Sequence, residues 1–143
     1  MIGLYDHLPL IIDRLQDQTA GFAKIDALSA IQNDEDVLRN LPGCWVAPGV
    51  GMSVDADSWA QTKLEHQSYM IVVCCKSVTD NNIYAEKTLG ELALSVIKAF
   101  DNFVFTGNGN FEHKLPREAV VYDDGYILQR LRFSVMQSPK EGL

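Results

Sequence analysis

Residues 60–77 read AQTKLEHQSYMIVVCCKS, and the expected fold is built around this segment. Polar and apolar side chains alternate along it, which is typical of a β-strand whose successive residues point to opposite faces. Up to Ser68 both faces are mostly polar, whereas from Tyr69 to Cys75 both are apolar. The pattern predicts a long central strand. Its second half should lie in the middle of a covered sheet, and its first half at a rim or beyond it.

The length of this strand points to assembly. A strand of about 17 residues would span roughly 55 Å at ~3.3 Å per residue, whereas a compact domain of this size is only about 40 Å across. Either the strand bends or breaks near its middle, or its polar half projects from the domain. A projecting strand needs a partner for its unpaired backbone groups, so we expect contacts between subunits here.

Apolar residues recur at helical spacing in two segments, residues 8–18 and 83–100, which predicts two main helices. Asp6 is the expected N-cap of the first helix. Short strands are expected at residues 22–26 and 44–47, and a short helix between them at 28–32 or 35–41. The run from Pro48 to about Trp59 should be a loop, and so should residues 106–110.

Asp124-Gly125 is a two-residue turn signal, and it predicts a hairpin of residues 118–122 and 126–136. Residues 138–143 should form a flexible tail. The order of elements predicts an α+β fold: a mainly antiparallel or mixed sheet with two main helices packed on one face, built around a long central strand. The 143 residues suit a single domain over residues 1–143.

The composition excludes several classes of protein. Hydrophobic residues make up 47% and charged residues 22%, as in ordinary globular proteins, and the net charge is −7. This acidic balance argues against a primary nucleic-acid binder and against docking on an anionic membrane. No run of 18 apolar residues predicts a transmembrane helix, and charged residues interrupt the first apolar run, so no signal peptide is expected.

The cysteines are Cys44, Cys74 and Cys75, an odd number with two adjacent, which is a poor disulfide framework. We expect three reduced thiols in a cytoplasm. A nucleophilic Cys74 or Cys75 would need a histidine base, and the sequence places none nearby, so a buried pair of small side chains is favoured.

No other segment predicts chemistry. His7, His66 and His113 lack a second ligand at metal-binding spacing, so structural or surface roles are expected and no metal. The pairs of aspartates at 55 and 57 and at 123 and 124 are better explained by a solvated loop and a turn. The glycines at 49–51 and 107–109 lack the context of a phosphate cradle. We therefore expect no catalytic site, no cofactor and no enzyme.

Five residues are candidates for an interface. Thr62, Leu64 and His66 share one face of the alternating segment, and Arg130 and Arg132 share one face of the last strand. The two arginines could meet an acidic partner surface, or they could lie on a solvated outer face of the strand. The residues leave these two interpretations equally open.

The order of the motifs from residue 5 to residue 136 resembles the tail terminator (tail completion) proteins of tailed bacteriophages. The matching motifs are YDHLP at 5–9, CWVAPG at 44–49, YMIVV at 69–73, the helix carrying Leu89, Leu92, Val96 and Ile97, and YDDGY at 122–126 followed by LRFSV at 131–135. Residues 106–116 match no part of the family pattern.

The resemblance implies a ring, commonly a hexamer, that caps the head-proximal end of the tail tube. Such a ring stops tube polymerisation and offers a surface to the head–tail connector, and in contractile tails it also meets the sheath. DNA passes through its lumen, for which an acidic chain is suited. The family implies no catalysis and no cofactor, a place in the virion, and assembly in the host bacterial cytoplasm.

Two alternatives remain open at this point. The first is another neck component, such as a head-closure ring, which would bind the connector instead of the tail tube. The second, ranked last, is a small thiol-dependent enzyme that uses Cys74 or Cys75 with a histidine.

Overall fold

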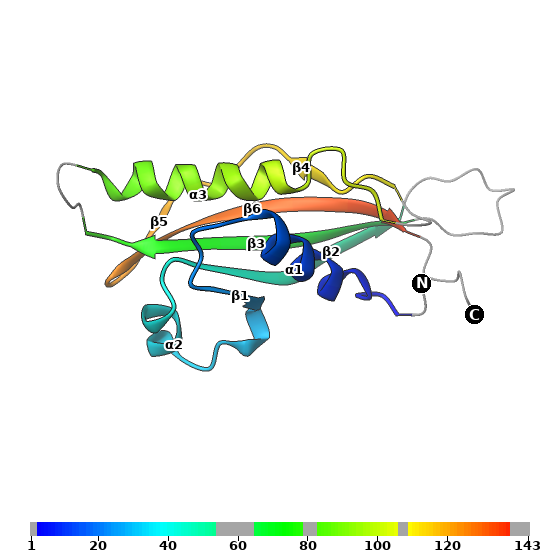
Figure 1. Cartoon of the computed structure of the whole chain (residues 1–143). Helices are drawn as coiled ribbons and strands as arrows, with labels where there is room; N and C mark the ends of the chain where they lie inside the picture. Colours follow the sequence, from blue (N-terminus) through cyan, green and yellow to red (C-terminus); the bar gives the residue numbers. More distant parts are fainter. Residues whose placement is uncertain (1–2, 54–64, 79–82, 106–108, 138–143) are drawn as a thin grey trace, which may run out of the picture.

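The computed structural model describes residues 3–53, 65–78, 83–105 and 109–137 (Figure 1). The elements follow in this order: α1 (His7–Gln18), β1 (Lys24–Ala27), the 3₁₀ turn η1 (Leu28–Ala30), α2 (Asp34–Arg39), β2 (Gly43–Ser53), β3 (Glu65–Lys76), α3 (Ala85–Ala99), β4 (Glu112–Lys114), β5 (Val121–Tyr122) and β6 (Tyr126–Gln137). Both positions considered for the short helix are used, one by η1 and the other by α2.

The six strands form one mixed sheet in the order β1-β2-β3-β6-β4, and β5 also pairs with β6. β1 runs parallel to β2, while every other pair is antiparallel. The predicted α+β class, with a mainly antiparallel or mixed sheet, is therefore confirmed.

One face of the sheet is covered by α1 and α3, which lie side by side along it (Figure 1). The buried positions Ile11 and Leu15 of α1 and Leu89, Ala93 and Val96 of α3 recur at helical spacing. They pack on the side chains that β2, β3 and β6 direct to this face. The prediction of two main helices on one face is confirmed.

Aromatic rings close one end of this core. Phe111 stacks on Phe133 of β6 with 4.9 Å between ring centres and an interplanar angle of 6°. Phe100 meets both rings edge-on, and Phe103 and Phe105 extend the group. Because Phe111 immediately precedes β4, the cluster fastens that short strand and the end of α3 onto the sheet.

β3 is the predicted central strand, and its described part neither bends away nor breaks. All 12 of its residues pair with β6, from Glu65 opposite Gln137 to Lys76 opposite Tyr126. The irregularity falls on the neighbouring strand instead, where the register of β2 shifts between Pro48 and Gly51. Residues 60–64 of the alternating segment lie outside the described residues.

Two local predictions were wrong, and a third was confirmed only in its position. Residues 48–53 continue β2 where a loop was expected, because they pair with the start of β3. Gln67 is only 3% exposed although it lies in the polar half of the strand, since its amide donates to the carbonyls of Gly49 and Ser68, each at 2.9 Å. Asp6 is the N-cap residue of α1, as predicted, but its side chain makes no capping hydrogen bond to the helix and instead accepts one from the Gly3 backbone amide at 2.9 Å.

Candidate assembly interface

The face of the sheet opposite α1 and α3 is only partly covered. At one end a small apolar cluster packs beneath α2, and its buried members are Val37, Trp45, Val72, Cys74 and Tyr126. Trp45 is 2% exposed and Val37 7% exposed, so α2 seals this end. Further along this face, Ala47, Met70 and Arg130 are half-buried and Arg132 is exposed.

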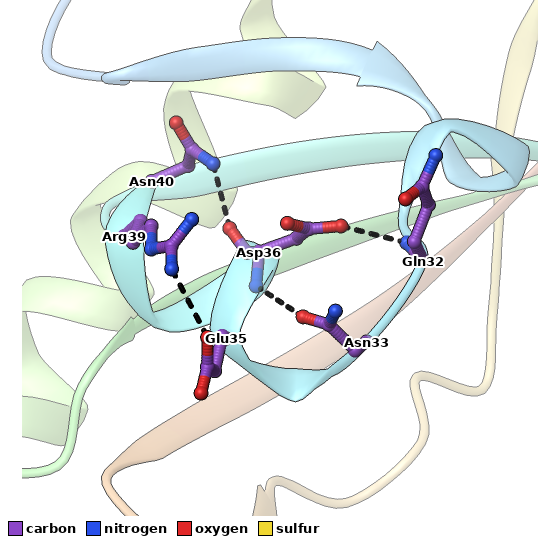
Figure 2. Close-up of polar contacts among 6 residues, drawn as sticks. All are labelled: Gln32, Asn33, Glu35, Asp36, Arg39 and Asn40. Carbon is purple, nitrogen blue, oxygen red and sulfur yellow. Dashed lines mark hydrogen bonds and ion pairs between the residues drawn. The ribbon is translucent and has the colours of Figure 1, made fainter.

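Side-chain hydrogen bonds hold the short helix α2 in place (Figure 2). The side chain of the N-cap residue Asn33 accepts a hydrogen bond from the backbone amide of Asp36 at 3.1 Å. The Asp36 carboxylate in turn accepts a hydrogen bond from the backbone amide of Gln32 at 2.8 Å. At the other end Asn40 donates to the Asp36 carbonyl at 2.6 Å. A helix of six residues is not stable alone, so these caps and the packing of Val37 keep it on the sheet.

Beyond α2 lies a surface that we call the open patch, formed by Ala47, Met70, Arg130 and Arg132. These residues are neighbours across three strands: Met70 of β3 pairs with Ala47 of β2 and with Arg132 of β6. Arg130 pairs with Val72 one step along the same face. Arg132 is exposed, and the other three are half-buried. The predicted common face of the two arginines is confirmed.

The two arginines also line a surface hollow of about 270 Å³ together with Pro116 and Glu118. Neither arginine forms an ion pair with any described residue. The loop carrying Glu118 is held from within, because the buried side chain of Gln129 donates to the Glu118 carbonyl. The hollow therefore places two guanidinium groups beside a loop whose backbone is held in position. Two neighbouring guanidinium groups are a suitable arrangement for binding carboxylates.

The other predicted interface residues are not brought to this patch. His66 is exposed near the start of β3, where it pairs with Met52 and Met136. Thr62 and Leu64 lie outside the described residues. The open patch adds Ala47 and Met70 to the candidates. Sequence reasoning missed them because an apolar strand residue gives no sign of which part of a face a helix leaves uncovered.

His7 has a structural role. It is 3% exposed, and the centre of its ring lies 4.4 Å from that of Phe105. Burial lowers the pKa of His7, and a hydrogen bond with Gln137 partly offsets this by raising it. The amide of Gln137 also donates to the Leu4 carbonyl at 3.2 Å and to Glu65 at 2.7 Å. This network ties the start of α1 to the ends of β3 and β6. His113 is half-buried, with its ring 5.2 Å from that of Phe133.

The cysteines are free and buried, as expected. Burial raises the pKa of the Cys74 thiol to about 12 and also raises the pKa values of Cys44 and Cys75. A thiol in this state stays protonated at neutral pH, whereas the nucleophile in thiol catalysis is the thiolate. The burial of all three thiols therefore speaks against the thiol-dependent enzyme.

Two features are absent from the residues that the structure describes. No group of three or more histidine, cysteine, aspartate or glutamate side chains there could hold a metal ion. No helix there is long and apolar enough to cross a membrane. Asp123-Asp124-Gly125 forms the predicted turn, in which the Asp124 amide donates to the Asp123 carboxylate at 2.7 Å.

Comparison with known proteins agrees with the resemblance seen in the motifs. No curated protein matched the chain. The family model described as Phage tail terminator protein matches residues 1–139 of the 143. This range includes every described helix and strand and all four residues of the open patch. The chain therefore belongs to the phage tail terminator protein family.

Proposed function

We propose that this protein forms a hexameric ring at the head-proximal end of a phage tail tube. There it stops polymerisation of the tube protein and provides the surface to which the head–tail connector joins, and in a contractile tail it also meets the sheath. The observation that carries the proposal is the family match over residues 1–139. The protein is then a structural component of the virion, assembled in the host cytoplasm.

The shape of the sheet supports a role in assembly. β2, β3 and β6 have 11, 12 and 12 residues, which corresponds to about 40 Å at ~3.4 Å per residue. This is longer than the usual strand of 3–10 residues. A long sheet lets one chain contact a neighbouring copy along its length and other rings at its two ends.

The charge of the chain is consistent with a ring through which DNA passes. Nonspecific DNA binding comes mainly from neutralising phosphates with lysine and arginine, and this chain carries 19 acidic against 12 basic residues. We expect DNA to be a transient passenger and not a ligand. In a mobility-shift assay at about 0.15 M salt the assembled protein should not retain duplex DNA, and retention would contradict this part of the proposal.

The test is cryo-electron microscopy of the purified protein mixed with tails that lack their terminator. Terminator-deficient tubes should acquire a ring at one end only and should then keep a fixed length. Tails that already carry a terminator are the matched control and should gain no density. If the protein leaves tube ends bare and overlong tubes persist, the function as a terminator is wrong. Binding to the connector alone would then identify a head-closure component.

A further inference from the structure

The open patch and α1 lie on opposite faces of the sheet and carry opposite charges. On α1 the side chains of Leu10, Asp13 and Asp17 are exposed, and their spacing of three and four residues places them on one side of the helix. We call these three residues the α1 stripe. They point away from the sheet, because the buried positions of the same helix face it.

The α1 stripe has no basic residue of its own helix beside it. The only lysine or arginine of α1 is Arg14, which is half-buried. Its Nε donates to the Ala99 carbonyl at 2.8 Å, and its guanidinium carbon lies 4.6 Å from the centre of the Phe103 ring. Among the described residues, Asp13 forms no ion pair, and the Asp17 carboxylate accepts a single hydrogen bond, from the side-chain amide of Gln18 at 2.7 Å.

The open patch has the complementary character. Its two arginines lack ion-pair partners among the described residues, whereas Lys24, Arg39, Lys87 and Lys114 each pair with a carboxylate of this chain. Beside Arg132 the patch offers the half-buried side chains of Met70 and Ala47. A partner that fits it therefore carries two carboxylates next to an apolar side chain.

We propose that the open patch of one copy binds the α1 stripe of a second copy of this chain, with Arg130 and Arg132 pairing with Asp13 and Asp17 and with Leu10 packing on Met70. The spacings agree. Arg130 and Arg132 are two residues apart on a strand, which separates them by about 6.8 Å. Asp13 and Asp17 are four residues apart on a helix, which separates them by about 6 Å along its axis. On each surface an apolar side chain adjoins one of the charged side chains. Exposed Leu10 lies three residues from Asp13 on the helix, and Met70 lies directly across from Arg132 in the sheet.

This contact joins two different surfaces of the same molecule. Because the surfaces lie on opposite faces of the sheet, each copy can bind one neighbour with its patch and another with its stripe. Such a head-to-tail contact closes into a ring when the rotation between neighbours permits. The inference rests on the proposed ring, for which it supplies the contact between adjacent subunits.

The test is a charge swap measured by sedimentation velocity over a range of protein concentrations, with and without terminator-deficient tails. The double variant Arg130→Glu with Arg132→Glu, and separately Asp13→Lys with Asp17→Lys, should each raise the Kd for self-association about 100-fold or more, since like charges would then face one another. An equimolar mixture of the two variants should restore association, because each altered surface meets its complement on the other variant.

The matched control reverses two charges elsewhere, Lys24→Glu with Lys87→Glu. Both side chains are exposed, on β1 and on the first half of α3. This variant should associate like the wild type, and circular dichroism should show native folding for every variant. If the arginine variant associates like the wild type, or if the mixture of the two swapped variants does not, the inference is overturned.

The outcomes separate this inference from the proposed function. If the arginine variant still forms rings on tube ends, the terminator role stands and this contact is wrong. If it forms rings but no longer holds tube ends, the arginines face the tube protein and the inference also fails. If the wild type and the mixture associate while tube ends stay bare, the contact stands and the terminator role fails. A wild type that is monomeric both alone and with tails overturns both.

Discussion

Replacing Phe111 with alanine should remove the side chain that holds the start of β4 on the sheet. Phe111 is 2% exposed and stacks on Phe133. Its ring also meets Phe100 at 4.7 Å and Phe105 at 5.4 Å between centres. Its backbone amide donates to the carbonyl of Phe103 at 3.2 Å, so the backbone beside the new cavity is already fixed.

The cost follows from burial and from the ring contacts. Truncating a buried phenylalanine to alanine costs about 3–5 kcal/mol in unfolding free energy. The upper half of that range applies here, since four neighbouring rings lose a partner and each aromatic pair contributes about 0.5–1.5 kcal/mol beyond its area. We expect about 4 kcal/mol. With a urea slope of about 2 kcal/mol/M, the midpoint of unfolding should fall by about 2 M.

The assay is urea unfolding followed by tryptophan fluorescence, since Trp45 is 2% exposed in the folded protein. Phe111→Leu is the matched control. It keeps most of the volume but loses the ring, and should cost about 1.5 kcal/mol. A loss below about 1 kcal/mol for the alanine variant, or equal losses for the two variants, would refute the argument that ring packing anchors this segment.

Three further predictions concern individual residues. Asn33→Ala removes the cap of α2 and should cost about 1 kcal/mol, lowering Tm by about 3–4 °C in a calorimeter; an unchanged Tm would show that the cap is dispensable. Gly125 has φ +86°, so Gly125→Ala should cost about 1–2 kcal/mol in urea unfolding. Burial lowers the pKa of His7 in the folded protein below its ordinary value of 6.5. As the pH falls, the unfolded chain therefore binds a proton at His7 before the folded protein does. The free energy of unfolding should then decline as the pH falls below 6.5. His7→Gln should flatten this decline between pH 7.5 and 5.5, and a slope equal to that of the wild type would contradict the assignment.

The candidate interface was predictable from the sequence only in part. The spacing of Arg130 and Arg132 was enough to place them on one face of a strand. Whether that face was solvated or available to a partner depended on where α2 lies, and α2 seals only the end around Trp45. Ala47 and Met70 join the arginines only through the strand pairing, because they are far away in the sequence.

Local sequence patterns were enough to predict the two main helices, the central strand, the α+β class and the family. The stripes of the two main helices, the alternation of the central strand and the Asp124-Gly125 turn are local signals, because a helix repeats every 3.6 residues and a strand every two. The motif order from residue 5 to residue 136 indicated the family that the comparison then confirmed.

The tertiary structure alone decided register, extent and burial. β2 continues past Pro48 because β3 lies beside it, and three-residue β4 exists because Phe111 is anchored on Phe133. Gln67 is buried because carbonyls on its own and the neighbouring strand accept its hydrogen bonds. Each of these outcomes depends on groups distant in the chain. Local periodicity can fix which face a side chain occupies, but only the pairing of strands fixes what lies opposite it.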